Sequence, residues 1–121
     1  MQPRVLLVHD DSAVRELSER TLGRMGVMID IVPRGEDAVR ALETNDYTVA
    51  VVDRSLCDGF LDVVARRTER PIVICTASEK DAAGLDTAVV NLLIPQPYDA
   101  STLVGVIIAC VTEKPPPALS P

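Results

Sequence analysis

The sequence contains few aromatic residues and no tryptophan: two tyrosines and one phenylalanine make up 2% of its 121 residues. Hydrophobic residues nevertheless account for 47% of the chain, so we expect one domain with an aliphatic core. Long apolar runs are also missing, and no stretch approaches the ~20 residues that a membrane-spanning helix needs. The opening MQPR is not followed by the apolar region of a signal peptide. We therefore expect no association with a membrane.

Runs of positive charge are absent as well. The formal net charge is −6, which argues against nucleic-acid binding by this domain. Cys57, Cys75 and Cys110 are odd in number and too widely spaced for a metal-binding pattern. Because three cysteines cannot all pair with one another, reduced thiols and a cytoplasmic location are expected.

Short apolar runs alternate with segments of helical periodicity along the chain. Five buried strands are predicted from the runs RVLLV, VMIDIV, YTVAVVD, PIVICTA and VVNLLI, which begin at residues 4, 27, 47, 71 and 89. Helices are predicted after the first four runs, from residue 11, over 36–44, over 59–69 and from residue 79. Asp11 or Ser12 is the expected N-cap of the first helix and Gly26 its C-cap, and Ser78 is the expected N-cap of the fourth.

The segment from Thr102 to Val111 can be interpreted in two ways. Its many β-branched residues favour a strand, whereas the preceding strand–helix alternation and the capping residues Asp99 and Ser101 favour a helix. We predict a helix, because tertiary context overrides propensity. The domain is then expected to span residues 1–113, followed by a Pro-rich tail or linker at 114–121.

Five strand–helix units predict an α/β fold with an open parallel sheet and helices on both faces. Ligands of such sheets bind beyond the carboxyl ends of the strands, near the point where the strand order reverses. Polar side chains at those ends are therefore the candidate site residues: His9, Asp10, Asp11, Asp53, Thr76 and Gln96.

Two of these carboxylates, Asp10 and Asp53, are expected to converge from different strands. Close carboxylates repel each other, so the pair favours a proton or a cation. Oxygen ligands favour Mg²⁺, and the Thr76 hydroxyl could contact an oxyanion bound to that metal. The residues thus indicate an acidic pocket suited to a phosphoryl group. In the alternative interpretation, the strand-end carboxylates only cap the helices that follow.

Four motifs in this order resemble the receiver domain of two-component response regulators over residues 5–111. VLLVHDDSAVRE is similar to the segment with a pair of acids, and counting back from Arg15 places that pair at His9 and Asp10. YTVAVVDRSL resembles the phospho-acceptor strand, PIVICTAS the switch strand and PQPYD the lysine–proline–aromatic turn. The resemblance implies a flavodoxin-like (βα)5 three-layer sandwich with a parallel sheet of order 2-1-3-4-5.

The resemblance also implies a function in phosphorelay signalling and no enzyme activity beyond self-catalysed phosphoryl transfer. Asp53 would accept a phosphoryl group from a histidine kinase or a phosphotransfer protein. Mg²⁺ would be bound by Asp10, Asp53 and the backbone carbonyl of Ser55, with His9 at the position of a further ligand. Thr76, Ala77 and Gln96 occupy the positions that contact the phosphoryl group and act as the switch. Their movement would alter the face formed by the fourth helix, fifth strand and fifth helix.

Several positions depart from the family pattern. His9 replaces an acid and is a poor ligand for Mg²⁺, Gln96 replaces a lysine, and Leu93 occupies the position of the switch aromatic. The acceptor loop DRSLCDG lacks the usual proline and is about two residues short relative to the family pattern. A shifted register with Asp10 and Asp11 as the acid pair would restore two acids.

One hypothesis follows from the joint loss of an acid and the lysine. Histidine titrates at ~6.5 when unperturbed, so His9 could act as a cation that neutralises the incomplete acidic pocket. Phosphorylation at Asp53 would then be slow or poor in metal. In the alternative interpretation, His9 simply faces solvent at the end of the strand.

A second hypothesis concerns partners. The uncharged segment from Thr102 to Val111 carries one apolar stripe for the sheet and a second one formed by Val104, Ile108 and Val111. An exposed second stripe would indicate a protein interface, and the matching face in receivers is a common homodimer surface. The Pro-rich tail folding back over the stripe is the alternative.

Other function classes remain open at this stage. The same fold could work as a pseudo-receiver, an interaction or dimerisation module that needs no phosphoryl group. A nucleotide enzyme is disfavoured, because no glycine-rich phosphate loop follows the first strand. An aspartyl phosphatase is disfavoured too, because Ser55 stands where a second acid would be needed. The sequence does not identify the kinase or the output.

Overall fold

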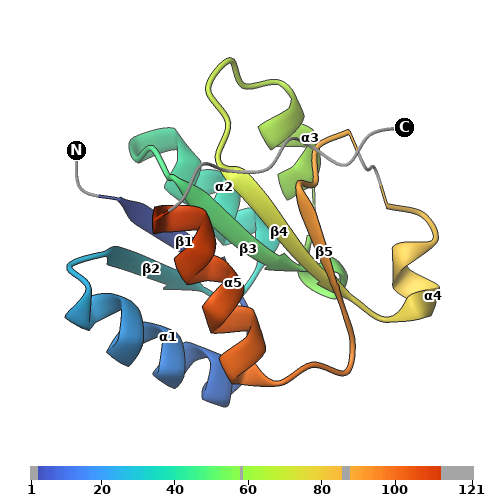
Figure 1. Ribbon diagram of the computed structural model, residues 1–121. Helices are drawn as coiled ribbons and strands as arrows, with labels where there is room; N and C mark the ends of the chain where they lie inside the picture. The colour runs from blue at the N-terminus through green and yellow to red at the C-terminus, as the bar shows by residue number, and fades with distance from the viewer. Residues whose placement is uncertain (1–2, 58, 86–87, 113–121) are drawn as a thin grey trace.

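Five parallel strands form a single sheet at the centre of the molecule (Figure 1). The computed structural model describes residues 3–57, 59–85 and 88–112. The strand order is β2-β1-β3-β4-β5, which confirms the predicted fold class and strand order. The strands are β1 (Arg4–Val8), β2 (Met28–Val32), β3 (Val49–Asp53), β4 (Ile72–Ala77) and β5 (Leu92–Pro95).

Helices cover both faces of this sheet and make a three-layer sandwich (Figure 1). One face is covered by α1 (Ser12–Arg24) and α5 (Ala100–Thr112), and the other by α2 (Gly35–Thr44) and α3 (Phe60–Ala65). A 3-10 turn, η1 (Arg54–Leu56), follows β3, and the short helix α4 (Glu79–Ala82) follows β4.

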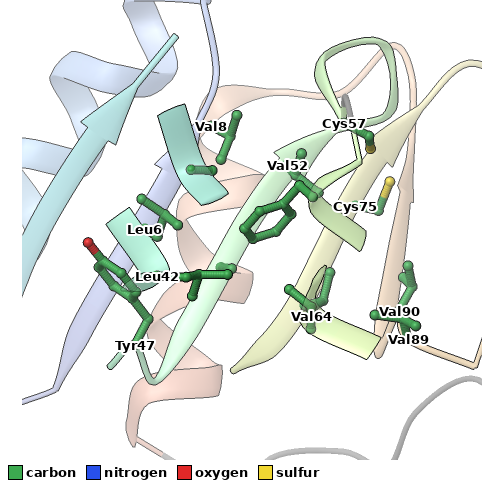
Figure 2. Packing of buried hydrophobic residues seen from close by; sticks show 14 residues of the cluster. Leu6, Val8, Leu42, Tyr47, Val52, Cys57, Val64, Cys75, Val89 and Val90 are labelled. Atoms are coloured by element: carbon green, nitrogen blue, oxygen red, sulfur yellow. The ribbon is translucent and has the colours of Figure 1, made fainter. Parts of the chain in front are cut away.

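The central strands are apolar along their whole length because both of their faces are covered. Neighbouring residues of one strand point to opposite faces. Leu6 belongs to the core cluster under α2 and α3, which Figure 2 shows, and Leu7 belongs to the cluster under α1 and α5. Phe60, the one phenylalanine, is fully buried in the first cluster. The core is otherwise aliphatic, as the composition predicts.

The last segment forms a helix, as predicted, although its β-branched residues favour a strand. Leu103, Ile107 and Cys110 form one buried stripe of α5 that lies on the sheet. Each large side chain buried in this way contributes about 1.5–3 kcal/mol, whereas a β-branched residue costs a helix at most about 0.7 kcal/mol. Burial therefore determines the structure of this segment.

The second stripe of α5 was expected to be exposed, but its side chains are buried or half-buried. Val104 is 3% exposed and belongs to the core, and Ile108 and Val111 are half-buried. The reason is that α1 packs along α5, so two sides of the helix are covered rather than one. A stripe of apolar residues therefore does not by itself indicate a free surface here.

The predicted N-caps Asp11 and Ser78 are confirmed by hydrogen bonds, whereas the C-cap of α1 is Met25, one residue before the predicted Gly26. Asp11 Oδ1 accepts from the backbone N–H of Ala13 at 2.8 Å, which makes Asp11 the N-cap of α1. Gly26, with a φ of 75°, follows the last turn of the same helix. Ser78 Oγ accepts from the N–H of Asp81 at 3.1 Å. These short-range signals could be recognised in the sequence because they depend on neighbouring residues.

Three elements differ most from the predictions in length. The helix expected over 59–69 ends at Ala65, because the residues that follow offer no apolar side chain to the core. The helix after Ser78 spans only Glu79–Ala82. The fifth strand begins at Leu92 instead of residue 89, because the side chain of Asn91 accepts the N–H of Val73 at 2.9 Å and replaces a ladder bond.

The predicted tail at 114–121 lies outside the described residues. No helix within the described ranges is long and apolar enough to cross a membrane.

Candidate functional site

The carboxyl ends of β1, β3, β4 and β5 surround one hollow of about 540 Å³. Parallel strands present these ends at the same edge of the sheet, and Asp53 of β3 lies directly beside Thr76 of β4 in the register. Side chains from four segments of the chain line the hollow: His9, Asp10, Asp11, Asp53, Ser78, Gln96, Pro97 and Tyr98. The structure thus brings Asp10 and Asp53 to a common site, as expected.

Asp53 is the most enclosed of the three carboxylates, with 8% of its surface exposed. Its Oδ1 accepts from the backbone N–H of Ser55 at 2.9 Å and from the Ser55 hydroxyl at 2.7 Å. Its Oδ2 accepts from the Thr76 hydroxyl at 3.1 Å and from the Gln96 side-chain amide at 2.7 Å. A carboxylate has about four acceptor positions. All of them are filled by this chain, which compensates for burying the charge.

Local sequence explains two of these donors. Asp53 ends β3 and caps the 3-10 turn η1, so the N–H of Ser55 points back at its carboxylate. The other two donors come from β4 and from the turn after β5, far away in the sequence. Gln96 takes the place of the expected lysine as a donor, but it brings no positive charge.

Asp10 and Asp11 differ in what they bind. The Asp11 carboxylate accepts backbone N–H groups at the start of α1 and is committed to that cap. Asp10 is exposed and lines the hollow, so it is the available carboxylate of this segment. Pairing Asp10 with Asp53 therefore fits the geometry better than the shifted register that pairs Asp10 with Asp11.

His9 is not a cation facing the carboxylates, and it does not face solvent. Its ring is 3% exposed. Nδ1 accepts the backbone N–H of Asp11 at 3.2 Å, and Nε2 lies 2.6 Å from the Tyr98 hydroxyl oxygen. A backbone N–H can only donate, so Nδ1 carries a lone pair and the neutral ring donates its Nε2 proton to Tyr98. Both sequence-based interpretations of His9 are therefore wrong.

The His9 contacts also exclude it as a metal ligand in this arrangement, because both ring nitrogens are engaged. Its partner could not be found in the sequence, since Tyr98 is 89 residues away. The two rings pack edge to face, with their centroids 6.1 Å apart. Together they join the turn after β1 to the turn after β5.

Tyr98 responds to the charge of the hollow. Burial, together with the carboxylates of Asp53, Asp11 and Asp10, raises the pKa of Tyr98 to about 12, and a hydrogen bond with Thr76 opposes this increase. The neutral phenol is therefore retained over the physiological range.

The remaining expected residues are placed as follows. Thr76 is fully buried, and Ala77 is 1% exposed. Leu93 is half-buried against the core cluster under α2 and α3 and does not line the hollow. Sequence reasoning missed Ser78 and Pro97 as parts of the wall and gave no role to the Ser55 hydroxyl. The one sequence signal for Ser78 in the wall is that it lies two residues after Thr76.

The donor set suits one mode of metal binding. Mg²⁺ is commonly held by one or two carboxylates together with phosphate oxygens and water, and Asp10 and Asp53 provide two carboxylates at the hollow. Asp53 would bind the ion by giving up one of its four hydrogen bonds. Within the described part of the chain, no three His, Cys, Asp or Glu residues gather closely enough to hold a metal ion by themselves. The site therefore fits Mg²⁺ bound together with a phosphoryl group better than a metal held by protein alone.

No family model matches the chain. It is 39% identical over 85 residues to the transcriptional regulatory protein GltR of Pseudomonas aeruginosa, a match that covers 64% of this chain and 35% of GltR. The chain thus spans about a third of the length of this curated relative.

Solved structures share its fold. The response regulator receiver domain (CheY-like) from Methylobacillus flagellatus superposes with a TM-score of 0.66 at 21% identity, over 91% of this chain and 99% of that one. The signal receiver domain of a putative LuxO repressor protein from Vibrio parahaemolyticus gives 0.71 at 21% identity, over 92% and 91%. The chain thus shares the fold of these receiver domains, and part of its sequence is similar to the regulatory protein GltR.

Proposed function

We propose that this domain receives a phosphoryl group on Asp53 from a histidine kinase or a phosphotransfer protein in two-component signalling. The observation that carries the proposal is the arrangement around Asp53 Oδ2. This oxygen lies at a hollow that Asp10 also lines, and it accepts hydrogen bonds from Thr76 and Gln96. Both donors come from other elements, so both can follow a change at Asp53.

Transfer would use Oδ2 as the nucleophile. The O–P bond forms at Oδ2 while the N–P bond of the donor phosphohistidine breaks, and the histidine leaves with its electron pair. Thr76 and Gln96 can then donate to the new phosphoryl oxygens instead of to Oδ2, while Ser55 continues to hold Oδ1. Such transfer depends mainly on positioning and charge stabilisation.

Mg²⁺ fits this proposal as a neutralising ion. Asp10, Asp53 and the backbone carbonyl of Ser55 would hold it, and it would offset the negative charge that the phosphoryl group brings beside two carboxylates. His9 has no part in this set, because its nitrogens bind Asp11 and Tyr98. Its role is to position the turn that carries Asp10.

Intact mass measurement tests the proposal. The protein is incubated with a small acyl phosphate and Mg²⁺. We expect the wild type to gain one phosphoryl group and Asp53→Asn to gain none. The Asn variant should keep the fold, since the Thr76 hydroxyl can rotate and the Gln96 amide can flip to accept from the new NH₂.

The exposed Asp62 of α3 provides a matched control. Asp62→Asn should gain the phosphoryl group as the wild type does. Equal phosphorylation of wild type and Asp53→Asn would refute Asp53 as the acceptor. A wild type that gains nothing would favour an interaction module that works without phosphorylation.

Association of two copies through α4, β5 and α5 stays a prediction. Ala109 lies on the exposed side of α5, so Ala109→Glu should weaken a dimer without disturbing the core. Thr44→Glu, on exposed α2, is the control. Sedimentation velocity, with and without phosphorylation, compares the variants, and an unchanged monomer throughout would refute this surface.

A further inference from the structure

Two buried thiols point toward each other in the core (Figure 2). Cys57 follows η1 and Cys75 lies in β4, and they are 5% and 0% exposed. The Cys57 thiol donates to the backbone carbonyl of Asp53 at 3.6 Å, and the Cys75 thiol donates to that of Thr76 at 3.7 Å. Both belong to the core cluster under α2 and α3, and both are reduced in the structure.

The Cys57 side of this pair borders a hollow. Cys57 lines a hollow of about 380 Å³ together with Arg54, Gly59, Leu61, Asp62 and residues 84–85. This hollow is separate from the one at Asp10. Arg54 Nε is a buried donor without an acceptor among the described residues, so the wall offers an unsatisfied donor to an incoming oxygen.

The two thiols differ in access. Cys57 lines the hollow, whereas Cys75 is fully buried and is not among the residues that line it. An oxidant that enters the hollow therefore meets the Cys57 sulfur first, and it is the thiolate of a cysteine that attacks oxidants.

We propose that Cys57 and Cys75 form an oxidisable dithiol, in which Cys57 reacts first with a peroxide and Cys75 then closes an intramolecular disulfide. The proposal rests on the pairing of the two thiols and on the hollow beside Cys57. It does not depend on phosphorylation of Asp53.

The chemistry balances with hydrogen peroxide as the oxidant. The Cys57 thiolate attacks one peroxide oxygen, so that an S–O bond forms, the O–O bond breaks and hydroxide leaves to become water. The Cys75 sulfur then attacks the Cys57 sulfenic acid. The S–S bond forms, the S–O bond breaks, and the departing hydroxide takes the Cys75 proton as a second water. Two electrons pass from the thiol pair to one peroxide.

Because of where the two cysteines lie, a disulfide between them would constrain the loop after Asp53. Cys75 directly precedes Thr76, and Cys57 lies in the loop that begins at Asp53. A bond between them would tie the loop after Asp53 to β4 beside the Thr76 hydroxyl.

Cys110 belongs to the core cluster on the opposite face of the sheet, and its exposed fraction of 6% nearly matches that of Cys57. It is therefore an internal control for burial.

The test treats the wild-type protein with hydrogen peroxide, alkylates the remaining thiols and digests the protein without reduction. We expect a peptide pair linked through Cys57 and Cys75, an intact mass lower by two hydrogens, and reversal by dithiothreitol. Cys110→Ser should give the same link. Cys75→Ser should instead accumulate a sulfenic acid on Cys57, which dimedone traps.

Alkylation without oxidant gives a second measurement. Because Cys57 and Cys110 are nearly equally buried but Cys57 lines a hollow, Cys57 should be alkylated severalfold faster than Cys110 at neutral pH. Recovery of Cys57 and Cys75 as separate alkylated thiols after peroxide treatment, or a link that involves Cys110 or a second chain, would overturn the proposal.

Discussion

At the scale of single residues, Asp53 shows how a buried charge is kept stable. Four donors from three segments of the chain surround its carboxylate. The identity of Asp53 as the central carboxylate was predicted from its place at the end of a buried strand. The donors Ser55 and Gln96 could not be assigned in the same way, because their directions depend on turns that only the folded chain defines.

Thr76 tests the contribution of one of these donors. Thr76→Val keeps the volume but removes the hydroxyl that donates to Asp53 Oδ2 in a fully buried position. We expect a loss of about 1–3 kcal/mol in the free energy of unfolding, because a buried charged acceptor loses a partner. Urea denaturation measures the change. Thr102→Val, at an exposed position of α5, should stay within about 0.5 kcal/mol of the wild type, and equal effects of the two variants would contradict the account.

The two tyrosines predict how stability changes with alkaline pH. Burial, with a hydrogen bond to Asp30, raises the pKa of Tyr47 to about 12, and Tyr98 is raised to about 12 as well. Because the folded pKa lies above the usual value of 10.0, the stabilisation is fully present below pH 10 and is lost as the pH rises from 10 through about 12.

Tyrosinate absorbance, measured against pH in folded and urea-unfolded protein, checks this prediction. The folded protein should titrate at the higher pH, and the free energy of unfolding should fall over the same interval. Coincident titration curves would show that neither hydroxyl is held by the fold. No other tyrosines contribute, since the sequence has two.

At the scale of elements, periodicity and caps predicted which segments are helices and strands, but not how far each extends. α5 forms because its buried stripe outweighs its strand propensity. α3 ends early because the residues directly after it offer no apolar side chain to the core. β5 begins late because the Asn91 side chain occupies the ladder position of the preceding residue. Contacts between elements determine where each helix or strand begins and ends, so the pattern within one segment does not predict these bounds.

Gly35 is a close contact between two elements. A Cβ added at this first residue of α2 would collide with the backbone carbonyl of Cys57 in the acceptor loop. We expect Gly35→Ala to destabilise the protein by about 1–3 kcal/mol, because the loop has to move away from α2. Thermal or urea unfolding measures this loss.

Gly105 supplies the matched control for that variant. It lies in the middle of α5 with open space around its Cα. Gly105→Ala should therefore stabilise the protein by about 0.5–1 kcal/mol through helix propensity alone. If both variants shift stability in the same direction, the close contact at Gly35 is not what limits that position.

At the scale of the whole molecule, the parallel sheet gathers side chains from distant segments at one edge. The order of the strands and the meeting of Asp10 and Asp53 at one hollow were predicted from the sequence, because strand ends in a parallel sheet share an edge. The neutral His9 held by Tyr98 was not predicted, because formal charge alone suggested a cation. Long-range contacts thus determine the charge state of His9 in the site, whereas the polar residues at the strand ends predict where the site lies.

The acidic hollow implies a dependence on Mg²⁺ that belongs to the assembled site. Asp10 reaches the hollow from β1 and Asp53 from β3, and neither can neutralise the charge of a phosphoryl group. Asp10→Asn should therefore slow phosphorylation of Asp53 by roughly tenfold or more and remove most of its response to Mg²⁺. Asp81→Asn, an acidic residue outside this hollow, should behave as the wild type.

The most direct measurement locates the phosphoryl group peptide by peptide after treatment with an acyl phosphate, with and without Mg²⁺. Our account predicts a phosphoryl group on the peptide containing Asp53, increased by Mg²⁺ in the wild type and not in Asp10→Asn. A phosphoryl group on any other residue, or equal occupancy of Asp53 whether or not Mg²⁺ and Asp10 are present, would contradict it.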